Sequence, residues 1–524
     1  MNSSLFNSSV PASACSAASI PYPNLFGAEF LSLEATLISN LSSNIHIGFY
    51  TNHGAVDVKN VNYCNVTVTY THPGQDDKIN VQVWLPQDTW NGRMQHIGGS
   101  GWQAGLHYAG LQGMTAAVGE GYATLGTDAG LGSEATPVNW GLLSPGNPNL
   151  YLLQDLVSTS LNDAAIIGKA VVNSYYGQPP RYSYYSGCSQ GGRQGMMLAQ
   201  KYPDAYDGIA ASAPAINWNE FLYSDFFPTL VMNELKEFPA PCELDAITAA
   251  AIAACDGIDG VTDGVITNSS LCAFDPRSVV GAPLNCTDST SITKISSAAA
   301  IVAEAAWTGG QKVDNTSLWF GMGKDTPLTA SVATGGSSVA ATTCASNGTC
   351  SSAGFEIASD WIKLFSLRNA SADLSTMTRE EYLQLWSDSL QQYGNVETNN
   401  PDLSRFRDRG GKLVSYHGLA DILIPHEGTT RYYDKVTAMD AQVHDYYRLF
   451  LAPGLGHCLG GTGAYPAGTF DAMRNWVENG TAPETLLAES LGSPTLTRPL
   501  CAYPKMQYYN GTGNATAGEG FYCA

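Results

Sequence analysis

The sequence predicts an α/β fold, with one doubly wound, mostly parallel sheet and a large inserted lid domain. Segments typical of strands alternate with helical segments from about residue 60 to residue 215, and the alternation returns after residue 405. This alternation is typical of a parallel sheet with helices on both faces. The intervening stretch has aromatic clusters and a Ser/Thr/Ala/Gly-rich segment at 328–354. We therefore expect a core of residues 1–214 and 406–524 and a lid domain of residues 215–405.

The expected elements follow in chain order. Apolar segments rich in β-branched and aromatic residues predict strands at 66–70, 79–86, 93–99, 122–130 and 182–187. Helices are expected over 151–175 and 191–203, the second ending at a proline. The late part of the chain predicts strands at 412–418 and 446–454 and helices near 428–440 and 469–480. The lid would then enter between two core strands, at the end of the sheet where ligands bind.

The charge balance argues against several classes of partner. The 524 residues carry 25 basic and 46 acidic side chains, which gives a net charge of −21. Such a surface repels phosphate backbones and anionic lipid headgroups, and no Lys/Arg cluster interrupts it. No segment reaches the roughly 18 apolar residues that a membrane span needs. We therefore expect no nucleic-acid partner and no membrane partner.

The cysteines and glycosylation acceptors predict a secreted, extracellular glycoprotein. There are 12 cysteines without any Cys-x-x-Cys pair, which disfavours zinc ribbons and thioredoxin-type sites. Asn-x-Ser/Thr acceptors are dense and occur at Asn2, Asn7, Asn40, Asn65, Asn268, Asn285, Asn315, Asn347, Asn369, Asn479, Asn510 and Asn514. The alternative is a cytosolic protein with buried free thiols and unused acceptors. Residues 1–22 have neither a basic n-region nor an apolar h-region, so no signal peptide is recognisable there.

The segment Gly187-Cys188-Ser189-Gln190-Gly191 matches the pattern Gly-x-Ser-x-Gly. Small flanking residues let a strand turn sharply into a helix and expose the serine hydroxyl. Alone the pattern is weak, because glycine and serine are common, and a structural turn with an inert serine is the alternative. A tyrosine-rich strand before it and a helix after it supply the setting that the motif requires. We therefore predict Ser189 as a nucleophile.

A serine nucleophile needs a base and a carboxylate that orients the base. In doubly wound enzymes with this turn, the acid and then the histidine follow the serine along the chain. Asp421 directly follows the strand at 412–418, although an aspartate there can also be a turn or helix-capping residue. His457 lies on a Gly-rich loop after the strand at 446–454, whereas the other late histidines are typical of packed, capping or surface positions: His417, His426 and His444. We predict the triad Ser189, Asp421 and His457.

Two cysteines flank this predicted triad. Cys188 precedes the nucleophile and Cys458 follows the base, so a disulfide between them is expected if Ser189 and His457 are in contact. The alternative is that each cysteine pairs elsewhere.

An oxyanion hole is expected beside the nucleophile. One donor would be the backbone N–H of Gln190, and the other an N–H of the Gly-rich turn at 98–101, for which we choose Ser100. A merely flexible turn is the alternative interpretation of that segment.

An aspartate-rich loop in the lid predicts a structural Ca²⁺ site. The segment CDGIDGVTDGVI places Asp256, Asp259 and Asp263 around the carbonyls of Val261 and Val265. Hard oxygen ligands on a curled loop suit calcium, although no EF-hand glutamate is present. The alternative is a cluster of Asp-Gly turns. Cys255 and Cys272 bracket the loop, and a bond between them would hold it closed.

Taken together, these motifs resemble the tannase and feruloyl esterase family. The likeness rests on GCSQGGRQGMMLAQKYPDAYDGIAASAPA (187–215), HGLADILIP, PGLGHC and ACDGIDGVTDGVI, and it covers nearly the whole chain. Segments such as PCELDAITAAAIAACDGIDGVTDGVITNSSLC (241–272) and LCAYPK (500–505) are most similar to the fungal tannases of the family. The resemblance implies an α/β-hydrolase fold, the same triad and the same calcium ligands.

The resemblance also implies disulfide pairs, namely Cys15 with Cys64, Cys242 with Cys286, Cys255 with Cys272 and Cys501 with Cys523. That leaves Cys344 and Cys350, which are close enough to join each other. The lid is shorter than in fungal tannases and has no dibasic processing site, so maturation into two chains is not expected.

The expected function is that of a secreted serine carboxylic ester hydrolase that cleaves esters of hydroxylated aromatic acids, with galloyl esters preferred. The alternative is a feruloyl or other hydroxycinnamoyl esterase. Substrates would be small aromatic esters, free or linked to polyphenols or cell walls. Aromatic residues at 217–227 and Trp102 would either wall the pocket or pack in the core. A non-catalytic binding protein on the same fold is disfavoured because all three triad residues are present, and a serine peptidase would use the same triad on an amide.

Overall fold

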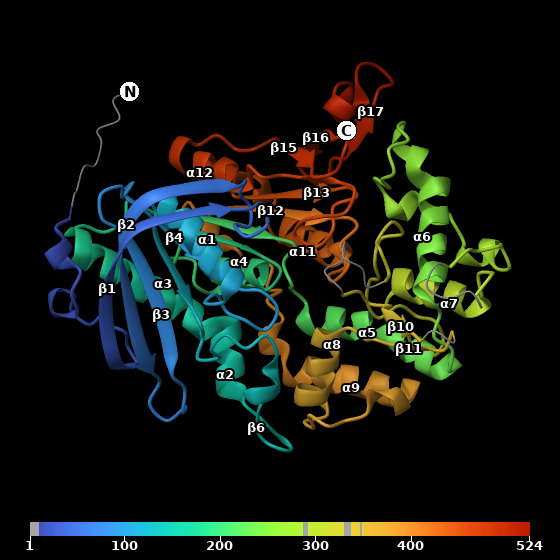
Figure 1. Ribbon diagram of the computed structural model, residues 1–524, viewed down its shortest axis with the longest axis horizontal. Helices are drawn as coiled ribbons and strands as arrows, with labels where there is room; N and C mark the ends of the chain where they lie inside the picture. The colour runs from blue at the N-terminus through green and yellow to red at the C-terminus, as the bar shows by residue number, and fades with distance from the viewer. Residues whose placement is uncertain (1–9, 287–291, 330–336, 346–347) are drawn as a thin grey trace.

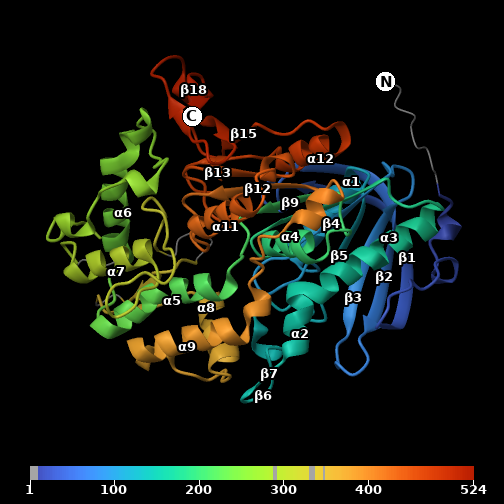
Figure 2. The ribbon, with the colours of Figure 1, turned by 180° about the vertical axis from the view of Figure 1, so that it is seen from behind.

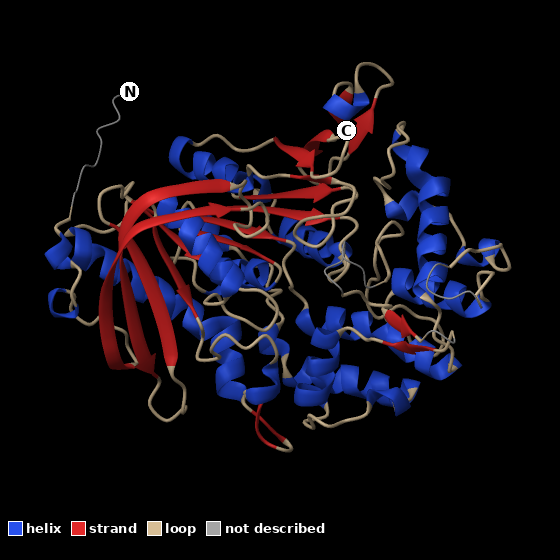
Figure 3. Cartoon of the chain, viewed as in Figure 1, coloured by secondary structure: helices blue, strands red, loops and turns tan. Residues whose placement is uncertain are grey.

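The computed structural model describes residues 10–286, 292–329, 337–345 and 348–524 (Figure 1). The predicted acceptors at Asn2, Asn7 and Asn347 lie outside these ranges. The centre is a nine-stranded sheet with the order β1-β2-β3-β5-β4-β8-β9-β12-β13 (Figure 3). Its last six strands run parallel: β5 (Ala123–Thr127), β4 (Arg93–Ile97), β8 (Tyr182–Cys188), β9 (Gly208–Ser212), β12 (Lys412–Gly418) and β13 (Tyr447–Ala452). The predicted doubly wound, mostly parallel sheet is confirmed.

The other edge of the sheet is antiparallel. It comprises the long strands β1 (Glu29–Ile45) and β2 (Val56–Thr71) and the shorter strand β3 (Ile79–Pro86). The sequence prediction missed β1, because this edge strand is rich in Ser and Asn and buries few of its side chains. Two register shifts in its middle and one near its start accompany the bend seen in Figure 1.

Helices cover both faces of the sheet (Figures 1 and 2). On one face, α1 (Tyr108–Gly119) and α12 (Thr469–Asn479) share a buried cluster with Val414 of β12. On the other face, α3 (Ser160–Tyr176), α4 (Gln190–Lys201) and α11 (His426–Met439) share a cluster with Leu413 of the same strand. Neighbouring residues of one strand therefore anchor opposite faces, as the alternation of side chains in a strand requires.

The chain between β9 and β12 is mostly helical and lies to one side of the sheet (Figure 2). It contains α5 (Trp218–Leu235), α6 (Pro241–Cys255), α7 (Ser297–Thr308), α8 (Glu356–Asp360), α9 (Arg379–Gln392) and the hairpin of β10 (Thr342–Cys344) and β11 (Cys350–Ser352). These elements bury their own apolar cluster, which Trp102, Trp140 and Leu156 join from the sheet side. We interpret residues 215–405 as a lid that packs on the loops at the carboxyl ends of the strands.

The helix expected over 151–175 is not continuous. It consists of α2 (Leu150–Gln154), a π-helical turn at Asp155–Thr159, and α3. Such a wide turn leaves backbone carbonyls out of the regular pattern and is frequently found near functional sites.

The remaining strands form small peripheral sheets. These are β6 (Leu142–Ser144) with β7 (Asn147–Pro148), β14 (Ala464–Tyr465) with β15 (Thr485–Ser490) and β16 (Thr497–Cys501), and β17 (Gln507–Tyr509) with β18 (Phe521–Cys523). In the described ranges, no helix combines the length and apolarity that crossing a membrane requires.

All 12 cysteines are paired. The disulfides are Cys15–Cys64, Cys188–Cys458, Cys242–Cys286, Cys255–Cys272, Cys344–Cys350 and Cys501–Cys523, the six pairs expected from the sequence and the family resemblance.

Candidate active site

Ser189 lies on a sharp turn between β8 and α4. Its backbone angles, φ 63° and ψ −124°, are rarely adopted by an L-amino acid. Flanking glycines make the turn possible: a Cβ on Gly187 would lie 2.6 Å from the backbone of Gly191, and a Cβ on Gly191 would lie 2.9 Å from the carbonyl oxygen of Gly99. The backbone at Gly187, Gly191 and Gly99 is therefore packed too closely for side chains. This close packing allows the sharp turn that exposes the Ser189 hydroxyl at the end of the strand.

The three residues predicted as a triad lie in one hydrogen-bonded chain. The Ser189 Oγ is 2.8 Å from His457 Nε2, and His457 Nδ1 is 3.0 Å and 2.9 Å from the two carboxylate oxygens of Asp421. Asp421 follows β12 and His457 follows β13, so the carboxyl ends of adjacent parallel strands bring both to the serine. In this arrangement, His457 can accept the Ser189 proton while Asp421 fixes the imidazole tautomer.

Asp421 is held in its ionised form. Only 2% of it is exposed, and one carboxylate oxygen accepts hydrogen bonds from the N–H groups of Leu423 and Ile424. Burial alone would raise the pKa of this carboxyl group, but His457 and hydrogen bonds from His417 and His457 hold it well below its ordinary value. Asp421 can therefore stabilise an imidazolium that forms on His457.

His417 is a second partner of Asp421, whereas its position within a strand predicted only a packed or hydrogen-bonded histidine. Its Nε2 is 3.2 Å from Asp421 and 3.1 Å from the carbonyl oxygen of Ile424, and Nδ1 is 2.9 Å from the Thr429 hydroxyl. Because a carbonyl can only accept, Nε2 carries the proton and also faces the carboxylate. The other late histidines have partners elsewhere: His426 faces Glu427, and His444 contacts the Tyr433 hydroxyl.

The disulfide Cys188–Cys458 joins the serine turn to the histidine loop. The two Cα atoms are 6.0 Å apart although the residues are separated by 270 positions. Each cysteine is adjacent in the chain to one member of the Ser189–His457 pair. The bond therefore restrains the distance across which the proton would move.

The geometry of the 98–101 turn does not support Ser100 as an oxyanion donor. Its N–H donates to the carbonyl oxygen of Gln103 at 3.1 Å, while the N–H groups of Gly98 and Gly99 donate to Ser186 and Gln194. Within the described residues, the Gly101 N–H is the one in this turn that donates to no other residue, and Gly101 lines a pocket with Ser189 and Gln190. Gln190 begins α4, so its N–H has no acceptor within the helix.

Arg193 is a further residue of this region that the sequence did not predict. It holds the side chain of Gln190. The side chain is fully buried, and its Nε donates to the Gln190 side-chain oxygen at 2.8 Å. The remaining guanidinium donors reach the carbonyl oxygens of Leu156 and Val157 in the π-helical turn and the hydroxyl of Thr398. Burial lowers the pKa of Arg193 to about 9. An isolated arginine in an otherwise nearly uncharged helix was the signal that could have identified it.

An apolar pocket adjoins Ser189. It is narrow, with a cavity volume of about 20 Å³, and is lined by Gly101, Ser189, Gln190, Ala215, Trp218, Phe221, Phe355, Ile357, Leu423 and Ile424. The residues from α5 and from the start of α8 place the lid directly over the serine. Trp102 does not line this pocket, because it is buried against Trp140, Trp218 and Trp361. The apolar lining favours an apolar or aromatic group beside the Ser189 hydroxyl, and the side chains of the lid must move apart to admit one.

The predicted calcium loop follows α6. Asp256 accepts hydrogen bonds from the N–H groups of Asp263, Gly264 and Val265, and Asp259 accepts from Val261 and the Thr267 hydroxyl. One oxygen of Asp263 pairs with Arg498, and the other is buried without a partner in the described part of the chain. Carboxylate oxygens keep further lone pairs, so this donor set fits a hard cation such as Ca²⁺.

Several known proteins are similar to this chain over most of its length. The family model described as "Tannase and feruloyl esterase" matches residues 64–524. A "Probable feruloyl esterase" of Arthroderma benhamiae is 41% identical, with 97% of this chain and 93% of the relative covered. A "Tannase" of Aspergillus oryzae is 31% identical, with 86% and 84% covered. Among solved structures, a tannin acyl hydrolase from Aspergillus niger superposes with a TM-score of 0.86 at 28% identity, covering 99% of this chain and 96% of the other.

Proposed function

Because the chain belongs to the tannase and feruloyl esterase family, whose members are carboxylic ester hydrolases, we propose that it is a secreted serine esterase acting on esters of hydroxylated aromatic acids. The observation that carries this proposal is the chain of hydrogen bonds Ser189–His457–Asp421 at the edge of an apolar pocket. The dense glycosylation acceptors and the six disulfides support secretion.

In the first half of the proposed reaction, Ser189 attacks the ester carbonyl carbon while His457 Nε2 takes the hydroxyl proton. The C–O bond to the alcohol breaks, and His457 returns the proton to the leaving alkoxide. In the second half, His457 removes a proton from water, the resulting hydroxide attacks the acyl-serine, and the aromatic acid leaves as Ser189 regains its proton.

Charge on the carbonyl oxygen would be stabilised by the N–H groups of Gln190 and Gly101. Both residues line the pocket beside Ser189, and fixed backbone donors cost no reorganisation when the charge develops. The apolar surroundings strengthen these hydrogen bonds by lowering the local dielectric constant.

We propose galloyl esters as the preferred substrates, supported by the full-length likeness to a tannin acyl hydrolase. Hydroxycinnamoyl esters are the second candidate. The relative with 41% identity is named a probable feruloyl esterase, and the pocket is lined mainly by apolar side chains, which suit an acyl group with fewer hydroxyls.

A substrate panel with matched variants tests this proposal. Propyl gallate, methyl ferulate and a peptide anilide are assayed with wild type, Ser189→Ala and Ser158→Ala, which removes a serine hydroxyl that instead contacts Tyr202. We expect Ser189→Ala to lose at least about 10³-fold in kcat, and Ser158→Ala to retain activity. Full ester turnover by Ser189→Ala would refute the mechanism, faster ferulate than gallate cleavage would refute the galloyl preference, and efficient anilide cleavage would indicate a peptidase.

We also propose that the α6 loop binds a structural Ca²⁺ through Asp256, Asp259, Asp263 and the carbonyls of Val261 and Val265. When bound, the ion together with Arg498 would balance the charge of the three carboxylates, and the ion would hold the loop closed. Chelation should lower the melting temperature, and added Ca²⁺ should restore it in wild type but not in Asp259→Asn. A melting temperature that changes with neither chelator nor added Ca²⁺ would contradict the proposed calcium site.

A further inference from the structure

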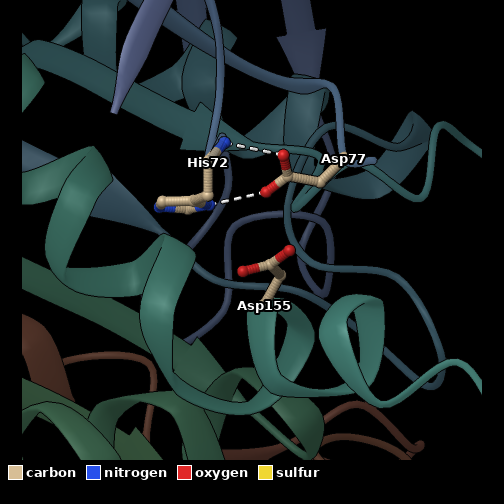
Figure 4. A group of neighbouring side chains, drawn as sticks. All are labelled: His72, Asp77 and Asp155. Carbon is tan, nitrogen blue, oxygen red and sulfur yellow. Dashed lines mark hydrogen bonds and ion pairs between the residues drawn. The ribbon is translucent and has the colours of Figure 1, made fainter. Parts of the chain in front are cut away.

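A buried cluster of one histidine and three aspartates lies away from Ser189. His72 and Asp77 belong to the turn between β2 and β3, Asp155 begins the π-helical turn, and Asp163 is on α3. His72 is 8% exposed, Asp77 and Asp163 are each 6% exposed, and Asp155 is 0% exposed. Figure 4 shows His72, Asp77 and Asp155 facing one another across this junction.

The histidine is oriented as a metal ligand would be. Its Nε2 is 3.1 Å from Asp163, and the same carboxylate oxygen accepts a hydrogen bond from the Tyr70 hydroxyl at 3.2 Å. The other ring nitrogen, Nδ1, is directed at Asp77. Histidines that bind metals commonly donate their second N–H to a carboxylate, which fixes the ring and the tautomer.

Asp77 is fixed in the same way. One of its oxygens accepts hydrogen bonds from the Thr71 hydroxyl at 2.6 Å and from the His72 N–H at 2.7 Å. The second oxygen is thereby directed toward His72 Nδ1, at 2.5 Å. The oxygen and Nδ1 share a proton in this arrangement, so a cation reaches both atoms only by displacing that proton and moving the two side chains apart.

Asp155 provides the independent observation. Neither of its carboxylate oxygens accepts a hydrogen bond from an N–H or hydroxyl group of the described residues, although the residue is completely buried, and its neighbour is the carboxyl group of Asp77. A buried carboxylate without a partner is strongly unfavourable, so its retention requires a cation or a proton at this place. Ligand atoms of His72, Asp77 and Asp155 all lie within 4.8 Å of one another.

We propose that His72 Nδ1, Asp77 and Asp155 bind a divalent transition-metal cation such as Mn²⁺ or Zn²⁺. Two carboxylates balance the charge of the ion, and the imidazole nitrogen favours such metals over Ca²⁺ and Mg²⁺, which prefer oxygen ligands alone. The ion replaces the proton between His72 Nδ1 and Asp77 and the proton that Asp155 carries in the absence of a cation, and both protons are released to solvent.

The position of the site gives the cation a structural role. It links the β2–β3 turn to the π-helical turn, whose Leu156 and Val157 carbonyls hold Arg193, which in turn holds Gln190. The bound ion therefore stabilises the support of the Ser189 region without contacting the ester. This role is separate from the calcium loop, which follows α6.

Metal binding by the full-length protein tests the proposal. Wild type, Asp155→Asn, Asp163→Asn and the control Asp360→Asn are stripped with chelator and returned to excess Ca²⁺, so that the α6 loop is supplied. Mn²⁺ and Zn²⁺ are then titrated by calorimetry, and bound metal is counted by mass spectrometry. Asp360 is a suitable control because it is another buried carboxylate with an unpartnered oxygen, outside this cluster.

We expect one equivalent of metal in wild type and in Asp360→Asn. Affinity should fall by about 10–100-fold in Asp163→Asn, which changes the hydrogen bonds to His72 and Tyr70 but no proposed metal ligand, and further in Asp155→Asn. Saturating metal should raise the melting temperature of wild type by about 2–5 °C and leave that of Asp155→Asn unchanged. Absence of a stoichiometric site for either metal, or equal binding by wild type and Asp155→Asn, would overturn the proposal.

Discussion

Arg193 is a buried cation whose hydrogen-bond partners in the described structure are all neutral. Its guanidinium spans Gln190, Thr398 and two carbonyls of the π-helical turn, a set that only a planar, forked group can reach together. These hydrogen bonds offset the cost of burying the charge, and they fix the first turn of α4. The residue therefore positions the Gln190 N–H rather than contacting the ester.

Replacing Arg193 should reduce kcat more than it raises KM. In Arg193→Lys, a single ammonium group cannot reach all four partners, so the start of α4 shifts and the oxyanion donor moves with it. A misplacement of about 1 Å costs on the order of 10²-fold in rate. Steady-state kinetics on the preferred ester would measure the change, with exposed Arg181→Lys as the control. A rise in KM with unchanged kcat would assign Arg193 to substrate binding.

At the residue scale, the catalytic candidates could be predicted where a residue of suitable chemistry also occupies the expected position along the chain. Ser189, Asp421 and His457 could be selected because a motif, a strand and a Gly-rich loop each marked one of them. The donor in the 98–101 turn could not be selected, because whether the N–H of Ser100 or Gly101 is free depends on a local bridge to Gln103. The contact between His417 and Asp421 was not predicted, because it forms only when the loop after β12 folds back onto the strand.

At the scale of elements, the Cys188–Cys458 bond joins the turn before α4 to the loop after β13. Removing it with Cys188→Ala and Cys458→Ala frees a loop of 270 residues. Loop-closure entropy limits the stability loss to about 5 kcal/mol. We expect a lower melting temperature together with a lower kcat, because His457 is no longer held at Ser189.

The hairpin disulfide Cys344–Cys350 offers a matched control. It closes a loop of 6 residues far from the triad in sequence, so its removal should cost about 2 kcal/mol at most by the same relation. The control variant should keep its kcat. If both double variants lose stability while turnover stays unchanged, the clamp is a stabilising crosslink with no part in catalysis.

Most of the parallel strands and their helices were predictable because each is a distinct apolar segment with a clear boundary, but β9 and the Gly-rich helix α1 were missed. Strand β1 was not, because an edge strand with one side in solvent lacks a continuous apolar pattern. The π-helical turn was also unpredictable, because the 5 residues of α2 are too few to show the shift in the apolar pattern that one additional residue causes. Its importance became clear from the hydrogen bonds of Arg193 to its carbonyls and from the burial of Asp155.

At the scale of the whole molecule, the two ends of the lid are joined by hydrogen bonds at Glu397. The N–H of Asn217 donates to the carbonyl oxygen of Glu397 at 2.8 Å, and the Asn219 side chain also donates to Glu397. Burial and the adjacent carboxyl group of Glu220 raise the pKa of Glu397 well above its ordinary value of 4.5. The folded protein therefore keeps a proton here that the unfolded chain releases.

The sign of this linkage sets a pH dependence. Below about pH 4.5 the glutamate is protonated in both states, and as the pH rises the unfolded state ionises first, so the folded state loses relative stability. Glu397→Gln should remove this loss and raise the melting temperature at pH 8 by about 1–3 °C, with little effect at pH 4.5. Thermal unfolding at both pH values measures it, with exposed Glu484→Gln as the control. An equal shift at both pH values would mean that the effect is not one of ionisation.

The Cys188–Cys458 bond also has a topological consequence. The entire chain from Ser189 to His457, including the lid, lies inside one covalent ring. Any single peptide-bond cleavage within that ring leaves two fragments that a sulfur bridge still unites, with the serine on one and the histidine on the other. A protease that nicks the lid thus converts one polypeptide into two without separating the groups that would share the catalytic proton.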